Sequence, residues 1–485
     1  MARQLAVGRV MTAPGQSKPK RDVILTLADG RIASVEPRAG GGDGAGLIAV
    51  PAMINAHDHG YGIAPIAFGA TDDALECWIT GLSVRPSIDP KLEALAAFGR
   101  MALGGIGATV HCHNSLVADR LEAEVAGVAQ AQREVGIRVA FCCPILDRNA
   151  WVYGGPSALL PWLSEADRAR LSNRLPREVP ARHLVAQVEA IASQHETDMF
   201  QIQYGPIGPQ WCHDATLEAI AEASAARGRR IHMHLLESRR QREWLDARYP
   251  GGVVKFLDKI GFLSPRLTVA HGVWLSEDDC ALLAERGVTV ALNTSSNLRL
   301  RSGMAPVQMF QRHGIRFAFG LDGSAFDDDQ DFLRDLRLAW LLHNGSELDS
   351  RLSPDRLFQA AYRDAFPVVG GSGAYGRIKP GTTADIAIYD YHAMARDIYV
   401  DDVDAAEVFL TRGTARHLNS VFVAGREVVR DGALPDLDLA AVENELHARA
   451  RADLTPSPRQ RALIGRQREA TRRYYADGAH TKANR

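Results

Sequence analysis

The sequence lacks long apolar runs, and no stretch approaches the ~20 apolar residues that a membrane-spanning helix needs. It also lacks a run of basic residues, and the 485-residue chain carries a formal net charge of −2 at pH 7. This pattern gives no basis for binding nucleic acid or an anionic membrane, so small molecules are the expected partners. The first ten residues contain no apolar stretch typical of a signal peptide, and we therefore expect a cytoplasmic location.

Cysteine is scarce as well. The chain has six cysteines, without any Cys-x-x-Cys motif or disulfide-like spacing. Such scattered cysteines suit a reducing compartment, which agrees with a cytoplasmic location. We expect most of them to be small residues of the core.

What the sequence does contain is a regular alternation of strands and helices after residue 50. Helical patterns at 86–104, 118–135 and 181–195 lie between apolar strand patterns. Eight such units over about 320 residues predict an α/β fold, a (β/α)₈ TIM barrel with insertions. The predicted strands end near residues 59, 113, 143, 205, 234, 271, 293 and 322.

The two ends of the chain have a different character. Residues 1–50 read as short strands with a turn at Asp29 and Gly30, and strand patterns return at 379–390 and 421–429. We expect these segments to pair in a small composite β-sandwich. The predicted divisions are 1–50 and 373–432 for the sandwich, 51–372 for the barrel and 433–485 for a helical tail with no visible chemistry.

The strand pattern that enters the barrel finishes in a His-x-His motif, His57 and His59. Because side chains alternate along a strand, both imidazoles should point the same way, with Asp58 on the opposite side. Together they could bind one metal ion. The alternative is a pair of surface histidines at a strand end, since short motifs occur often by chance.

Further polar residues close the other predicted strands, at the end of a barrel where enzymes place their chemistry. Three imidazoles and a carboxylate converging from separate strands fit Zn²⁺ or Fe²⁺ with one open coordination position. Taken singly, each is more often a structural residue than a ligand. These residues are His57, His59, His113, His234, His271 and Asp322, with Glu237 three residues beyond His234.

Several motifs together resemble the amidohydrolase superfamily, in particular the branch with guanine deaminase, S-adenosylhomocysteine deaminase and the triazine hydrolases. They are Pro-Ala-Met-Ile-Asn-Ala-His-Asp-His at 51–59, His-Met-His-Leu-Leu-Glu at 232–237, Asn-Thr-Ser-Ser-Asn at 293–297, Gly-Leu-Asp-Gly-Ser at 320–324 and Lys-Pro-Gly-Thr-Thr-Ala-Asp at 379–385. The resemblance covers nearly the whole chain.

By this resemblance, one divalent metal, Zn²⁺ or Fe²⁺, is held by His57, His59, His234 and Asp322. Glu237 would shuttle protons, His271 would hold the attacking water or the developing oxyanion, and Asp322 would also accept the proton of the water. Binuclear relatives use a lysine on the fourth barrel strand, but residues 199–205 contain none, so one metal is expected.

Substrate contacts are less well defined by the sequence. Asn297 is expected near the substrate by the same resemblance, and Gln203 on the fourth strand is a further candidate. Trp78 lies in a loop that could contact the substrate or simply pack. His111 and His113 lie on one face of their predicted strand. If that face lines the barrel lumen, we expect His113 to contact the substrate without binding the metal, with His111 one layer deeper. The alternative is a core residue, because a deeply buried histidine is usually part of the core.

The resemblance implies a deaminase that releases ammonia from a nitrogen heterocycle. A hydrolase releasing an amine, halide or thiol, or opening a cyclic amide, is the first alternative. A non-catalytic relative used for binding or assembly is the second. We also expect a homodimer.

Overall fold

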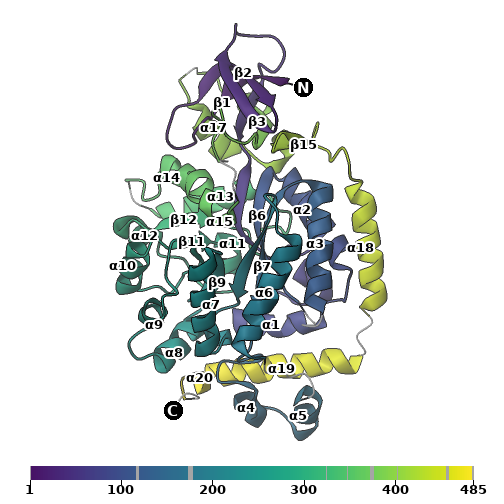
Figure 1. Ribbon diagram of the computed structural model, residues 1–485, viewed down its shortest axis with the longest axis vertical. Coiled ribbons are helices and arrows are strands. Elements are labelled where there is room, and N and C mark those ends of the chain that lie inside the picture. The colour runs from purple at the N-terminus through teal and green to yellow at the C-terminus, as the bar shows by residue number, and fades with distance from the viewer. Residues whose placement is uncertain are drawn as a thin grey trace.

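A barrel of parallel strands forms the centre of the computed structural model (Figure 1). The structure describes residues 2–115, 120–172, 179–323, 325–346, 348–371, 376–400, 402–454 and 458–482. Within these residues the barrel sheet has eight strands, each parallel to the next, from β5 to β12. The first and last strands meet where the backbone N–H of Asp322 donates to the carbonyl of His57 at 2.9 Å. The predicted barrel is therefore confirmed. Its strands are β5 (Met53–Asp58), β6 (Ile106–Cys112), β7 (Arg138–Ile145), β8 (Phe200–Pro206), β9 (Ile231–Leu235), β10 (Leu267–His271), β11 (Thr289–Leu292) and β12 (Arg316–Phe319).

Helices follow the strands and form an outer layer around them (Figure 1). The long apolar side chains of strands and helices meet in one core, whereas the barrel lumen holds mostly small residues such as Ala108, Ala140 and Ala291. The lumen is closed at its N-terminal end by Val368 and Val369. The α-helices of this part are α1 (Leu75–Gly81), α2 (Pro90–Leu103), α3 (Leu121–Val135), α4 (Pro156–Leu159), α5 (Glu165–Ser172), α6 (Ala181–His195), α7 (Asp214–Arg227), α8 (Arg239–Arg248), α9 (Val253–Lys259), α10 (Glu277–Glu285), α11 (Thr294–Arg299), α12 (Val307–His313), α13 (Phe332–Asn344), α14 (Pro354–Phe358) and α15 (Phe366–Val369). Shorter 3₁₀ turns are η1 (Pro65–Phe68), η2 (Leu82–Val84), η4 (Leu160–Trp162) and η5 (Pro209–Trp211), and η6 (Gln359–Asp364) is a π-helix.

A second sheet, of seven strands within the described residues, joins the two ends of the chain in the order β15-β14-β13-β4-β1-β2-β3. Its own apolar cluster contains Val7, Leu25 and Ile386. The predicted composite domain is therefore present as one continuous hydrogen-bonded sheet. The division predicted between residues 372 and 373 lies outside the described residues. The elements are β1 (Arg3–Val10), β2 (Lys20–Ala28), β3 (Arg31–Pro37), β4 (Leu47–Pro51), β13 (Ile386–Asp390), β14 (Leu418–Val423) and β15 (Arg426–Val429), with α16 (Tyr391–Ala395), α17 (Ala405–Arg412) and η7 (Ala415–His417).

The apolar run before His57, which the sequence presents as one strand, is two strands in the structure. At Ala52 the chain passes from β4 of the seven-stranded sheet to β5 of the barrel. The N–H of Ala52 donates to the carbonyl of Asp385, and that of Met53 donates to Gly105 on the barrel side. Both halves are buried, so the run has no polar residue to mark the change of sheet.

One buried ion pair fastens the two sheets together. Arg138 on β7 donates from Nε to Oδ2 of Asp385 at 2.9 Å, and both side chains are 5% exposed. Asp385 also accepts the N–H of Ala424, in the turn between β14 and β15. The aspartate that ends the motif at 379–385 thus joins the barrel to the C-terminal strands.

Replacing Asp385 by alanine is expected to lower the free energy of unfolding by about 3–5 kcal/mol, because it removes the carboxylate beside a buried guanidinium. Urea denaturation would measure the loss. Asp436→Ala is the matched control, since Asp436 pairs with Arg426 at the surface and should contribute at most about 1 kcal/mol. Equal losses in the two variants would contradict this role of Asp385.

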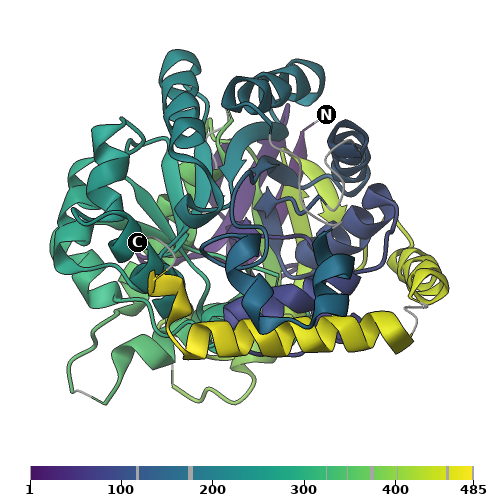
Figure 2. The ribbon, with the colours of Figure 1, turned by 90° about the horizontal axis from the view of Figure 1, so that it is seen from below.

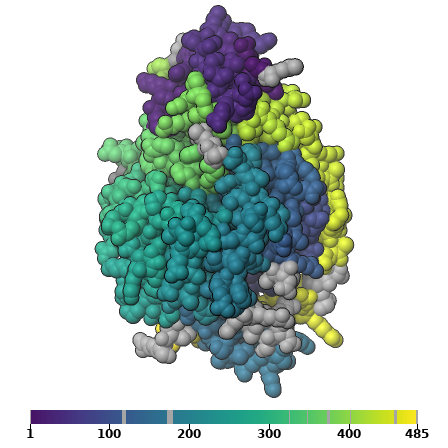
Figure 3. Space-filling view, viewed as in Figure 1, coloured from purple at the N-terminus to yellow at the C-terminus, as the bar shows by residue number. Residues whose placement is uncertain are grey.

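The C-terminal segment runs along the outside of the barrel (Figures 1 and 3) and then across its far end (Figure 1). Helix α18 (Leu439–Asp453) packs on α2, helix α19 (Pro458–Ala476) on α1, and helix α20 (Ala479–Lys482) on α8. Seen from below, α19 crosses one side of the barrel end opposite the seven-stranded sheet (Figure 2). The predicted helical tail is thus docked on the end of the barrel where the strands finish.

The six cysteines all lie within the described residues and are buried and unpaired. No helix in the described part of the chain is both long and apolar enough to cross a membrane.

Candidate metal and catalytic site

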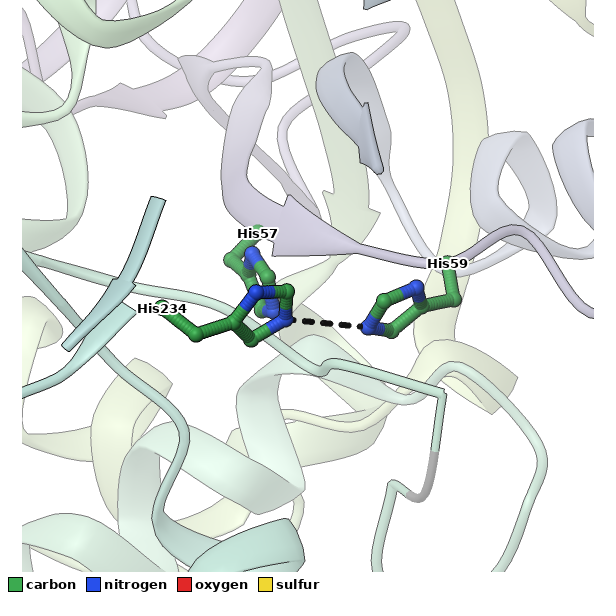
Figure 4. A group of neighbouring side chains, drawn as sticks. All are labelled: His57, His59 and His234. Atoms are coloured by element: carbon green, nitrogen blue, oxygen red, sulfur yellow. Dashed lines mark hydrogen bonds between the residues drawn. The ribbon is translucent and has the colours of Figure 1, made fainter. Parts of the chain in front are cut away.

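Three of the predicted ligands meet at the C-terminal ends of the barrel strands (Figure 4). His57 is in β5, His59 follows that strand, and His234 is in β9. One ring nitrogen from each lies within 4.8 Å of the others. Nε2 of His59 and Nε2 of His234 face each other at 3.4 Å, the pair joined by the dashed line in Figure 4. The structure therefore brings the predicted histidines together.

In His59 and His234, the other ring nitrogen, Nδ1, is bonded to a backbone carbonyl. Nδ1 of His59 lies 2.8 Å from the carbonyl oxygen of Cys112, and Nδ1 of His234 lies 2.7 Å from that of Ile207. A carbonyl only accepts, so each Nδ1 carries the proton and each neutral ring has its lone pair on Nε2. Two lone pairs therefore face each other across 3.4 Å, an arrangement that a bound cation stabilises.

Burial keeps the imidazoles neutral. It lowers the pKa of His57 to about 4, and it lowers the pKa of His59 and, more strongly, that of His234. Nε2 of His57 is buried without a hydrogen-bond partner among the described residues. Neutral imidazoles are the form that binds metals, so the donor set fits a divalent ion.

Asp322 supplies the negative charge of the cluster. Its Oδ1 lies 3.2 Å from Nε2 of His59 and 3.6 Å from Nε2 of His57. The hydroxyl of Ser296 donates to Oδ2 at 2.7 Å. Burial alone would raise the pKa of Asp322, but its interactions with the imidazoles of His57, His59 and His271 hold it well below the usual range. The carboxylate is therefore ionised beside three neutral rings.

Glu237 lies on the other side of the cluster and has the opposite protonation preference. Its Oε2 is 3.6 Å from Nε2 of His271, and Ser302 donates to its Oε1 at 3.2 Å. Burial, followed by the charges of Asp322 and Glu76, raises its pKa well above that of an exposed glutamate. Two carboxyl groups whose pKa values are shifted in opposite directions are the arrangement expected of a base and an acid in one site.

Two asparagines hold the ring of His271. Nδ1 of His271 lies 2.8 Å from Oδ1 of Asn297, and Nδ2 of Asn293 lies 3.5 Å from Nε2 of His271. Because the amide oxygen accepts, Nδ1 carries the proton and Nε2 carries the lone pair. The structure thus places Asn297 at His271, within the site.

Three residues at these strand ends have a left-handed backbone conformation. Leu236, His271 and Asp322 have φ values of 50°, 73° and 58°, in the left-handed region that non-glycine residues seldom adopt. Such strain persists only where the surroundings fix it, and it is common at functional sites.

The structure does not bring His113 into this cluster. Its Nε2 lies 2.9 Å from Oε2 of Glu124 on α3, and its ring packs on Phe141. On β6 the lumen face is made by Val110 and Cys112, so residues 111 and 113 face the outer helices. This position contradicts the predicted contact of His113 with the substrate. It fits the alternative, a histidine that belongs to the core.

Gln203 and Trp78 also lie outside the cluster. Gln203 is in the middle of β8 and donates to the carbonyls of Val368 and Val369, at the closed N-terminal end of the lumen. Its amide nitrogen is bonded to the backbone there, and its contact with substrate stays a prediction. Trp78 packs with Tyr61 and Leu300, as the packing alternative predicts.

Sequence reasoning missed several neighbours of the candidate ligands. His232 lies below His57, with Nε2 2.8 Å from Nδ1 of His57 and the two rings stacked. Tyr61 stacks on His59, and Asn114 donates to the hydroxyl of Tyr61 at 2.6 Å. The His-x-His pair at 232–234 was the one available signal, because alternation puts both rings on one face.

Comparison with known proteins gives a consistent result. Residues 48–428 match the family model described as the amidohydrolase family. A 5-methylthioadenosine/S-adenosylhomocysteine deaminase of Thermococcus onnurineus is 35% identical over 198 residues, 41% of this chain and 46% of that protein. An 8-oxoguanine deaminase of Pseudomonas aeruginosa is 27% identical over 434 residues, 86% of this chain and 92% of that protein. The chain thus spans less than half the length of the Thermococcus protein and most of the Pseudomonas one.

Solved structures share the fold. The atrazine chlorohydrolase of Arthrobacter aurescens TC1 in complex with zinc has a TM-score of 0.77 and 23% identity, with 92% of this chain and 98% of that chain covered. An adenosine deaminase of Xanthomonas campestris with bound zinc has a TM-score of 0.74 and 22% identity, with 93% and 98% covered.

Proposed function

The chain belongs to the amidohydrolase family, and we propose that it is a metal-dependent hydrolase that deaminates a nitrogen heterocycle. The observation that carries the proposal is the pair of opposed Nε2 lone pairs of His59 and His234 beside the ionised Asp322. We assign the metal to His57, His59, His234 and Asp322. Zinc is proposed because it favours nitrogen and carboxylate donors in four-coordinate sites, and because related structures contain it.

A bound divalent ion supplies Lewis acidity, which makes hydroxide available from water near neutral pH. The residues around it divide the remaining work. Neutral His271, with its proton on Nδ1, offers Nε2 as an acceptor, which favours holding the attacking water over donating to an oxyanion. Asp322, ionised, accepts the proton that the water loses. Glu237, protonated, donates to the ring nitrogen next to the carbon that is attacked.

This division of roles suits an amidine-like carbon with an adjacent ring nitrogen. The proton from Glu237 neutralises the charge that develops on that nitrogen. The proton that Asp322 accepted from water passes to the amino group, which leaves as ammonia, and the new hydroxyl on the attacked carbon returns a proton to Glu237. Phosphate esters suit the site poorly, because the acidic groups gathered with the imidazoles, Asp322 and Glu237, repel phosphate charge. The relatives named as deaminases support ammonia as the product.

The proposal extends to the setting of the enzyme. We propose a cytoplasmic homodimer acting on a small molecule, with the barrel assigned to residues 51–372 and the composite sheet to residues 1–50 and 373–432. The alternative of a non-catalytic relative is disfavoured, because four candidate ligands and Glu237 are all present and close together.

The test is to assay the zinc-loaded protein for ammonia release across purines, pterins, pyrimidines, triazines and imidazolones, with mass spectrometry of the products. We expect ammonia in equal amount to the substrate consumed. Turnover without ammonia would favour an amine, halide or thiol as the leaving group. Cleavage of phosphate esters alone would overturn the proposal.

A further inference from the structure

Helix α19 of the C-terminal segment is bound to the mouth of the site through a buried carboxylate. The side chain of Asp73, just before α1, is 3% exposed. Arg468 and Arg472 of α19 both donate to its Oδ2, at 2.6 and 2.5 Å. A buried carboxylate is costly unless it is paired, so the loop before α1 is stable in this conformation with α19 in place.

Asp73 continues this connection towards Glu237. Its Oδ1 lies 3.2 Å from Nη1 of Arg301, in the loop after α11. The next residue, Ser302, donates its hydroxyl to Oε1 of Glu237. One chain of contacts therefore runs from α19 through Asp73, Arg301 and Ser302 to Glu237.

A second chain of contacts starts at the end of α19. The hydroxyl of Tyr475 accepts the backbone N–H of Tyr153 at 3.0 Å, and the hydroxyl of Tyr474 donates to the carbonyl of Tyr153 at 2.6 Å. Both backbone polar groups of Tyr153, in the long loop after β7, are thus held by adjacent residues of α19.

The side chain of Tyr153 carries the connection inward. Its hydroxyl donates to Oε1 of Glu76 at 3.3 Å, and the hydroxyl of Ser238 donates to the same oxygen. Ser238 directly follows Glu237 and caps α8 by accepting the N–H of Gln241 at 3.2 Å. Gln241 in turn accepts the N–H of Glu237 at 2.8 Å. The backbone of Glu237 is therefore fixed through this second chain of contacts.

From these two chains of contacts we propose that α19 is a positioning element of the active site, which fixes Glu237 for proton transfer through Tyr475 and Asp73. The inference rests on the proposed function, in which Glu237 transfers the proton. It assigns a catalytic consequence to a helix that has no residue among the candidate ligands. Correct placement matters because a displacement of about 1 Å at a reacting group costs up to ~10²-fold in rate.

The test is Tyr475→Phe, which keeps the ring and removes the hydroxyl that accepts the N–H of Tyr153. We expect kcat to fall about 10-fold or more, with KM and metal content unchanged. Hydrogen exchange followed by mass spectrometry should be faster at the amides of Glu237 and Gln241. The double variant Arg468→Gln/Arg472→Gln tests the contact with Asp73 and should have the same effects. If Tyr475→Phe fails to fold, this double variant alone tests whether α19 positions Glu237.

The matched control is Arg466→Gln. Arg466 is also on α19 and makes two bonds of 2.8 Å to Asp167 of α5, but this pair does not lead to Glu237. Wild-type kcat and wild-type exchange at 237–241 are expected in the control. Unchanged kcat and exchange in the folded variants of Tyr475 or of the two arginines would overturn the inference. If the wild-type protein turns over no heterocycle, the proposed function fails, while the exchange experiment still decides whether α19 fixes Glu237.

Discussion

Replacing His59 by alanine is expected to remove the bound metal and to lower turnover by about 10³-fold or more. Nε2 of His59 is within 3.4 Å of Nε2 of His234 and 3.2 Å of Oδ1 of Asp322, so the variant loses the donor that links the two. Metal catalysis contributes several kcal/mol to stabilising the transition state, and each 1.4 kcal/mol is a factor of ten in rate. Elemental analysis and turnover of the purified variant measure the two losses together.

The control for this experiment is His313→Ala, which removes a histidine that pairs with Glu277 at the surface. It should keep one metal per chain and full activity. In the wild-type protein, chelation should abolish turnover and added zinc should restore it. Two tightly bound metals per chain, or full activity without metal, would contradict the assignment of a single site.

The barrel could be predicted from sequence because its strands are short apolar runs between helices of regular period. Helix α6 has the predicted bounds, Ala181–His195, since Pro180 precedes it and its apolar residues recur at helical spacing. The change of sheet at Ala52 could not be predicted. Both β4 and β5 are buried, so the sequence is apolar on either side of the junction, and only the pairing partners of the two strands differ.

Some residues of the candidate site could likewise be predicted from the sequence, and others could not. The candidate ligands His57, His59 and His234 could be predicted because each ends an apolar strand, and the ends of parallel strands meet in space. The side chain of His113 was harder to place, because alternation along β6 relates it to His111 without saying which face is the lumen. The pairing of Asp73 with Arg468 and Arg472 spans almost 400 positions of the chain, so no local pattern could indicate it.

Glu237 is the residue whose chemical role depends most on its surroundings. It comes directly after Leu236, which has a positive φ, and Gln241 accepts its backbone N–H, while Ser302 donates to its carboxyl group. Since burial raises its pKa, the acid form persists to higher pH than it would for an exposed glutamate. As pH rises through the pKa of Glu237 in the folded protein, Glu237 loses its proton. Turnover, which needs the protonated form, should then decline.

Glu237→Gln is therefore expected to lower kcat by ~10² or more while the metal content stays at the wild-type level, because glutamine keeps the shape and removes the titrating group. The decline of kcat at high pH that Glu237 causes should also disappear. Steady-state kinetics across the pH range and elemental analysis would measure both effects. Glu277→Gln is the matched control, since Glu277 lies at the surface beside Arg312. A Glu237→Gln enzyme with full activity would remove Glu237 from proton transfer, and loss of metal in the variant would make it a ligand.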